Sequence, residues 1–148
     1  MILILLSTTI ISFSQVELAG FKLGEVYSEN GSQTTIGGVD GFIGFGKIKD
    51  GRVSHIIFFP SDNHIDIIKI YHSDIDRIVA DLEEKFSITF RKQKNGNDGA
   101  DYYLLAKSPG ASYRCNVKGD YFSDSPCSFS LVITNDELQK IYDKEKQE

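Results

Sequence analysis

The stretch GFIGFGKIKDGRVSHIIFFP, residues 41–60, contains two apolar runs joined by Asp50-Gly51. An Asp-Gly pair between alternating hydrophobic segments is typical of a β-hairpin, because a two-residue type I′ turn needs positive φ at both central positions. Both faces of this hairpin would be apolar, so we expect the rest of the chain to cover each face. The cross-strand pairs predicted by this turn are Ile48 with Val53, Lys47 with Ser54, Gly46 with His55, Phe45 with Ile56, Ile43 with Phe58, and Phe42 with Phe59.

Two amphipathic helices are expected after strand-like segments. Ser73 with Asp76 predicts a capping box at the start of the first helix, and Thr134 with Glu137 predicts the second. The apolar residues that follow recur at helical spacing, which indicates one buried stripe on each helix. These stripes are Ile75, Ile78, Val79, Leu82 and Phe86 in the first helix, and Leu138, Ile141 and Tyr142 in the second.

Short alternating segments fill the chain between the two helices. Pro109-Gly110 predicts a turn, and the stretch 111–117 places Tyr113 and Cys115 on one face with Arg114 on the other. The two halves of the chain share a hairpin-then-helix pattern. We therefore predict an α+β fold with a mostly antiparallel sheet of about five to seven strands, on which two amphipathic helices pack.

The N-terminal segment indicates export. Residues 1–13 are uncharged and largely apolar, and Ser12 and Ser14 supply small residues at the positions that precede a cleavage site. The apolar run is too short to span a bilayer and fits a secretory signal peptide, although it lacks a preceding Lys or Arg. We expect a signal peptide at residues 1–14, a single domain at 15–148 with no membrane span, and a secreted or periplasmic location.

The charge pattern argues against nucleic acid as a partner. The 148 residues carry a net charge of −5, and Lys and Arg are spread along the chain without a basic block. Phosphate backbones are bound by clustered cations, which this sequence does not offer.

Cys115 and Cys127 are the two cysteines of the chain. An even number of cysteines in an exported protein is typical of a disulfide, and both residues fall on the core faces of strands expected to be neighbours. A Cys115–Cys127 bridge would stabilise the fold by roughly 3 kcal/mol in the chain-entropy model. The spacing fits neither a zinc site nor a redox CxxC motif.

Candidate catalytic and metal-binding residues are few. His64 and His72 flank an acidic segment, and with Asp62, Asp66 and Asp74 they could hold a divalent cation. The glycines of residues 37–46 lack the spacing of a phosphate-binding loop and are interpreted as packing positions, while His55 is interpreted as a hydrogen-bonded core residue. We expect no cofactor, no metal and no catalytic machinery.

Tyr121 and Phe122 lie in the middle of the segment between the cysteines. Two adjacent aromatic residues on a bridged loop are suited to recognition, because the bridge lowers the ordering cost of binding. The alternative is that one ring folds back over the sheet.

The sequence favours a secreted or periplasmic, non-catalytic binding module that recognises a protein or small ligand outside the cytoplasm. Two alternatives remain open. One is a small metal-dependent hydrolase that uses His64, His72 and the nearby carboxylates. The other is a protein inhibitor that presents the disulfide-bridged loop with Tyr121 and Phe122.

Overall fold

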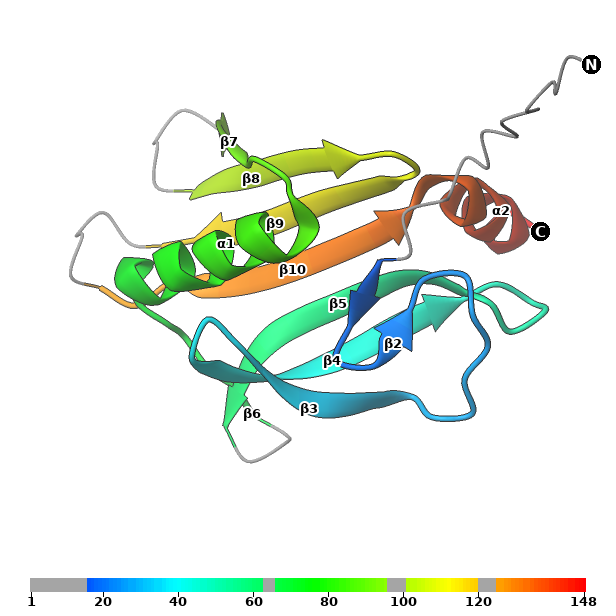
Figure 1. Cartoon of the computed structure of the whole chain (residues 1–148), viewed down its shortest axis with the longest axis horizontal. Coiled ribbons are helices and arrows are strands. Elements are labelled where there is room, and N and C mark those ends of the chain that lie inside the picture. The colour runs from blue at the N-terminus through cyan, green and yellow to red at the C-terminus, as the bar shows by residue number, and fades with distance from the viewer. Residues whose placement is uncertain (1–15, 63–65, 96–100, 120–124) are drawn as a thin grey trace, which may run out of the picture.

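The computed structural model describes residues 16–62, 66–95, 101–119 and 125–148 (Figure 1). The predicted signal peptide at 1–14 lies outside these ranges. The helices are α1 (His72–Phe86) and α2 (Asp136–Lys146). The strands are β1 (Glu17–Leu18), β2 (Phe21–Lys22), β3 (Gly31–Ile36), β4 (Val39–Lys47), β5 (Val53–Asp62), β6 (Asp66–Ile67), β7 (Arg91–Asn95), β8 (Asp101–Ser108), β9 (Ala111–Lys118) and β10 (Ser128–Asn135).

The strands form one large antiparallel sheet and one small hairpin. The large sheet has eight strands in the order β3-β4-β5-β10-β9-β8-β7, with β6 paired to β5 outside this path. It consists of two meanders, β3–β5 and β7–β10, which meet where β5 pairs with β10 over four residue pairs. Strands β1 and β2 pair with each other.

The predicted sheet of five to seven strands is therefore wrong in size, although the α+β class holds. The edge strands of the sheet are short or polar. β3 has the sequence GSQTTI and β7 has RKQKN, and each lies at one end of the strand order. An edge strand is held by backbone hydrogen bonds to one neighbour and needs no alternating apolar pattern, so hydrophobic periodicity gives little sign of it.

The central hairpin has the predicted register but a different turn. Ile43 lies opposite Phe58, and the register continues to Gly46 opposite His55. A β-bulge then follows, so that Lys47 pairs with Val53 in place of the predicted Ser54. The N–H of Ile48 donates to the carbonyl of Arg52 at 3.0 Å, and Gly51 has φ +96°. The turn is thus a three-residue loop with glycine in the left-handed region.

Helix α1 begins two residues earlier than the Ser73 cap predicted. Tyr71 is the N-cap, and the Asp74 carboxylate accepts a hydrogen bond from the Tyr71 N–H at 3.0 Å. The helix ends at Ser87, which adopts a left-handed conformation and donates its N–H to Glu83. The predicted apolar stripe is confirmed: Ile75, Ile78 and Leu82 are buried, and Val79 and Phe86 pack against the same core.

Helix α2 also begins with a different cap from the one predicted. Asn135 takes the place of Thr134, and its side-chain oxygen accepts the N–H of Leu138 at 3.1 Å. Leu138 is buried, Tyr142 is half-buried, and Ile141 is exposed. The predicted stripe of this helix is therefore only partly covered.

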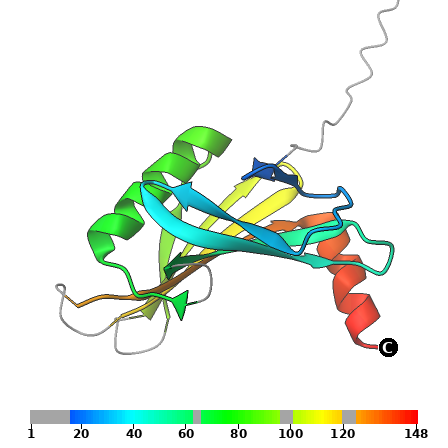
Figure 2. The same cartoon turned by 90° about the horizontal axis from the view of Figure 1, so that it is seen from below.

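The two faces of the large sheet are covered unequally. Helix α1 and the β1–β2 hairpin lie over one face, here called the inner face, while α2 lies at one end of the opposite, outer face (Figure 2). The inner-face side chains of Ile43, Ile56 and Phe58 are fully buried. Phe42 and Phe59, on the outer face of the same hairpin, remain partly exposed and contact each other with ring centroids 5.7 Å apart. The expectation that both faces are covered is therefore wrong for the outer face.

Candidate functional site

The predicted disulfide is absent from the structure, in which Cys115 and Cys127 are both thiols. The strand register explains the difference, because Cys115 lies opposite Leu131 of β10 and Leu104 of β8. Cys127 lies just before β10 and instead forms an isolated bridge with Ile70, exchanging two backbone hydrogen bonds with it. Burial raises the pKa of the Cys115 thiol to about 12. Tyr121 and Phe122 lie outside the described residues.

His72, at the start of α1, is partly buried and contacts two side chains. Its Nδ1 lies 3.2 Å from the Tyr102 hydroxyl, and its Nε2 lies 3.2 Å from Cys127 Sγ. The imidazole also stacks on the Tyr102 ring, at 6.1 Å between centroids and 14° between planes. Burial, with a smaller contribution from Cys127, raises the pKa of Tyr102 to about 12.

A thiol beside an imidazole is the arrangement of a cysteine nucleophile and its base. In this protein, however, the sulfur lies in the core: Cys127 is 1% exposed, and His72 is itself partly buried. A substrate has no access to the sulfur in this arrangement. The cluster therefore joins α1 to the sheet, and the polar atoms of His72, Tyr102 and Cys127 serve one another as hydrogen-bond partners.

The carboxylates of the hydrolase alternative do not join His72. Asp74 caps α1 and pairs with Arg77, and Asp66 is exposed on β6. Within the described ranges, no three His, Cys, Asp or Glu side chains come together as metal ligands. His64 is outside those ranges. Among the described residues of the predicted metal site, His72 and Asp74 contact different partners, and Asp66 is exposed.

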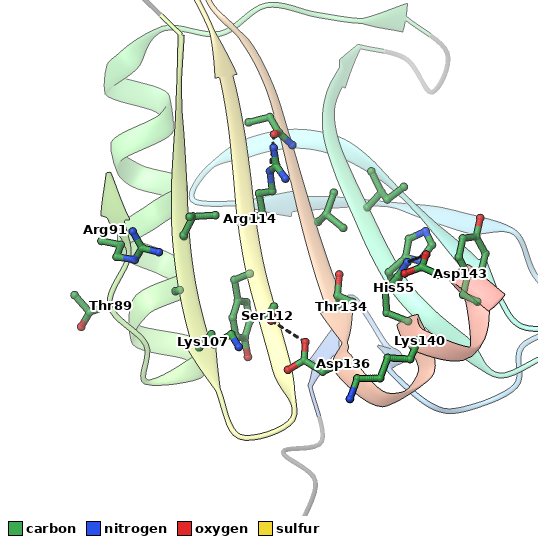
Figure 3. A pocket seen from close by; sticks show the side chains of 18 residues that line it. His55, Thr89, Arg91, Lys107, Ser112, Arg114, Thr134, Asp136, Lys140 and Asp143 are labelled. Atoms are coloured by element: carbon green, nitrogen blue, oxygen red, sulfur yellow. Dashed lines mark hydrogen bonds between the residues drawn. The ribbon is translucent and has the colours of Figure 1, made fainter. Parts of the chain in front are cut away.

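A wide hollow in the described part of the molecule lies on the outer face of the sheet, where sequence analysis proposed no site. It is an open groove of about 1310 Å³ between α2 and the strands β5, β10, β9, β8 and β7 (Figure 3). Its floor is made by outward-facing strand residues, and α2 forms one wall. The floor and wall carry Ile57, Leu105, Arg114 and Val132 together with Arg91, Lys107, Asp136 and Lys140.

Strand register arranges the floor as a row that crosses the sheet. Arg91 of β7 lies opposite Leu105 of β8, and Leu105 lies opposite Arg114 of β9. The row continues through Val132 of β10 to Ile57 of β5. Two arginines therefore flank Leu105 in one half of the row, and the apolar Val132 and Ile57 form its other end. The three apolar members of the row are partly exposed, and both arginines are exposed.

The cations of the groove lack acidic partners. Arg91, Lys107, Arg114 and Lys140 form no ion pair within the described residues. Arg114 instead donates to the Asn116 side-chain oxygen at 3.0 Å and lies over the Tyr103 ring at 4.1 Å. The other two arginines of the chain each pair with a neighbouring aspartate, Arg52 with Asp50 and Arg77 with Asp74.

The two acidic residues in the α2 wall are already hydrogen-bonded. The Ser112 hydroxyl donates to Asp136 at 2.7 Å, and the Gln139 amide donates to Asp143 at 2.9 Å. The four cations and two aspartates give the groove a local positive excess in a chain whose acidic residues outnumber its basic ones by 21 to 16.

His55 closes the groove beneath α2. Its Nδ1 lies 2.9 Å from Ser54 Oγ, and its ring meets Tyr142 edge-on with centroids 5.0 Å apart. Burial lowers the pKa of His55, which favours the neutral imidazole. A Cβ on Gly46 would lie 2.1 Å from the His55 ring, so this glycine makes room for the imidazole, in agreement with its interpretation as a packing position.

Comparisons of the chain with protein-family models, with curated proteins and with solved structures find no match. Neither helix in the described part of the chain has the length and apolar character needed to cross a bilayer. The case for a function therefore depends on the geometry of the molecule.

Proposed function

We propose that this protein is a secreted or periplasmic, non-catalytic binding module that recognises its partner through the groove on the outer face of the sheet. The observation that supports this proposal is the unequal covering of the sheet. Ile57, Leu105 and Val132 remain partly exposed in one row although the inner face of the same strands is buried. Partly exposed apolar side chains interspersed with polar and charged groups are typical of an interaction surface.

The interior arrangement also favours binding over catalysis. Cys127 is buried, its Sγ lies 3.2 Å from Nε2 of the partly buried His72, and neither residue lines the groove. The groove itself offers guanidinium and ammonium groups, which bind anions, and His55, which is held neutral under α2. These groups recognise and orient a ligand without a positioned nucleophile.

Partner capture tests the binding role. The protein, tagged at its C-terminus, is used to capture partners from the extracytoplasmic fraction of its own cells, beside Val132→Glu and Val26→Glu. Val132 is at the centre of the groove floor, whereas Val26 is 64% exposed and lies outside the groove. We expect the protein and the Val26 variant to capture the same partner and the Val132 variant to lose it. Capture by all three would contradict a role for the groove.

Protein recovery tests the location. N-terminal sequencing of the chain from the extracytoplasmic fraction should begin near Gln15. Recovery from the cytoplasm with Met1 retained would contradict export.

A further inference from the structure

We propose that the groove binds an extended acidic segment of a partner protein, in which two carboxylates precede two apolar side chains. This inference rests on the proposed function, because it names the partner chemistry of the same groove. The reasons are the partners of the arginines, the order of side chains along the cross-sheet row, and the size of the groove.

The arginines give the charge of the ligand. Arg52 and Arg77 are occupied by aspartates, while Arg91 and Arg114, on the two sides of Leu105, form no ion pair in the described structure. A guanidinium presents planar, paired donors that match a carboxylate, and such charge-assisted hydrogen bonds are among the strongest in proteins. Two such groups in one row are complementary to two acidic side chains.

The order of the row gives the sequence pattern of the ligand. From Arg91 to Ile57 the row takes four steps between adjacent strands, or about 19 Å at roughly 4.8 Å for each step. Six residues of extended chain at about 3.3 Å each cover about 20 Å. Alternate side chains of an extended segment point the same way. A segment with the pattern Glu-x-Glu-x-Leu-x-Leu therefore places its first acid at Arg91, its second between Leu105 and Arg114, within reach of the long Arg114 side chain, and its leucines toward Val132 and Ile57.

The size of the groove favours a polypeptide as its occupant. A volume of about 1310 Å³ open to solvent exceeds the enclosed pockets of roughly 300–1,000 Å³ that bury small ligands. A second copy of this chain is a poor match, because a two-fold pair would set the groove against itself and bring its cations together. The aspartates of α2 accept hydrogen bonds from Ser112 and Gln139, and the four cations outnumber them in the lining of the groove.

The test uses the whole protein and fluorescein-labelled synthetic peptides. The probe is Glu-Ser-Glu-Ser-Leu-Ser-Leu, and its counterparts carry Gln or Lys in place of both Glu residues. Fluorescence anisotropy is followed for the protein, for Arg91→Gln with Arg114→Gln, and for the matched control Arg52→Gln with Arg77→Gln. Circular dichroism and thermal unfolding check that each variant is folded.

We expect the acidic peptide to bind at least about tenfold more tightly than the Gln peptide, since each charge-assisted hydrogen bond contributes more than a neutral one. The Lys peptide should bind least. The Arg91/Arg114 variant should lose about tenfold in affinity for the acidic peptide alone, and the Arg52/Arg77 control should keep it. Added salt should weaken the acidic peptide selectively.

Equal affinity for the Glu and Gln peptides, absence of binding by all three, or equal losses in both arginine variants would overturn the acidic-segment proposal. Sedimentation that shows a dimer dissociated by Val132→Glu would overturn it as well, because a second copy would then occupy the groove. The binding module would survive these first three results if partner capture still depended on Val132. Both proposals would be refuted if Val132→Glu left partner capture unchanged and Arg91→Gln with Arg114→Gln left peptide binding unchanged.

Discussion

The inner and outer faces of the sheet are built from the same strands in opposite ways. Along β9, Tyr113, Cys115 and Val117 point inward and are at most 1% exposed. Ser112 and Arg114 alternate with them on the outer face, where they stay in contact with solvent. The inner face supplies the stability of the fold. The outer face, which contributes little to the core, is available for recognition, and the comparison between the two can be tested directly.

The largest difference between the faces should appear in thiol chemistry. Burial that raises the pKa of Cys115 to about 12 from the ordinary 9.0 lowers its thiolate fraction roughly 1000-fold near neutral pH. We expect a disulfide-exchange reagent to label only the added thiol of Lys118→Cys, on the exposed side of β9, in the folded protein.

Unfolding in guanidinium chloride without a reductant should then make the thiols of Cys115 and Cys127 accessible to the reagent. If the unfolded protein without the Lys118→Cys substitution shows no reactive thiol, Cys115 and Cys127 form a disulfide, in contradiction to the structure.

Substitution of two adjacent phenylalanines compares how much each face contributes to the free energy of unfolding. Phe58 is fully buried on the inner face, and Phe59 is partly exposed on the outer face. Phe58→Ala should lower the free energy of unfolding by about 3–5 kcal/mol, because it leaves a core cavity. Phe59→Ala should cost about 1 kcal/mol or less. Urea denaturation measures both, and equal losses would show that the outer face is covered.

Two glycines of β4 compare positions on the outer face. A Cβ at Gly46 would lie 2.1 Å from the His55 ring, whereas at Gly44 the nearest atoms lie 3.9 Å away. Gly46→Ala should therefore lower the free energy of unfolding by about 1–3 kcal/mol through overpacking. Gly44→Ala should be close to neutral. Similar effects of the two substitutions would contradict the packing of His55 under α2.

The smallest effect should be the pH dependence due to His55. Burial lowers its folded-state pKa below the unfolded value of about 6.5, so the unfolded chain binds the proton more readily. Above this pH both states are neutral and His55 adds no pH dependence. As the pH falls below about 6.5, the protein should lose stability relative to His55→Gln until the folded state also protonates. A difference that grows in favour of the native chain on acidification would contradict this sign.

Local signals in the sequence predicted the central hairpin and the core stripe of α1. Asp50-Gly51 placed the turn within one residue, and the pairing of Ile43 with Phe58 followed from it. The helix caps lie within two residues of the predicted Ser73 and Thr134, at Tyr71 and Asn135, and helix ends are the least certain part of a sequence-based prediction. The bounds of the polar edge strands β3 and β7 are less evident, because GSQTTI and RKQKN carry little hydrophobic pattern of their own.

The groove could not be assembled from the sequence. The alternation around Arg114 was visible, as was the polar position of Arg91 beside Phe90. Their convergence depends on the register of β7, β8 and β9, which alternation along each single strand does not fix. The predicted disulfide is wrong because of register as well, since the pairing of β9 with β10 sets Cys115 opposite Leu131.

The seam between β5 and β10 has a consequence for the order of assembly. Each meander closes through short local connections, and β9 and β10 pair over eight residue positions, whereas the seam has four and joins segments from the two halves of the chain. Loop closure makes such distant pairing the slower event. We expect the two meanders to form as separate cooperative units and β5 to pair with β10 last. The floor of the groove is then completed only at the end of folding.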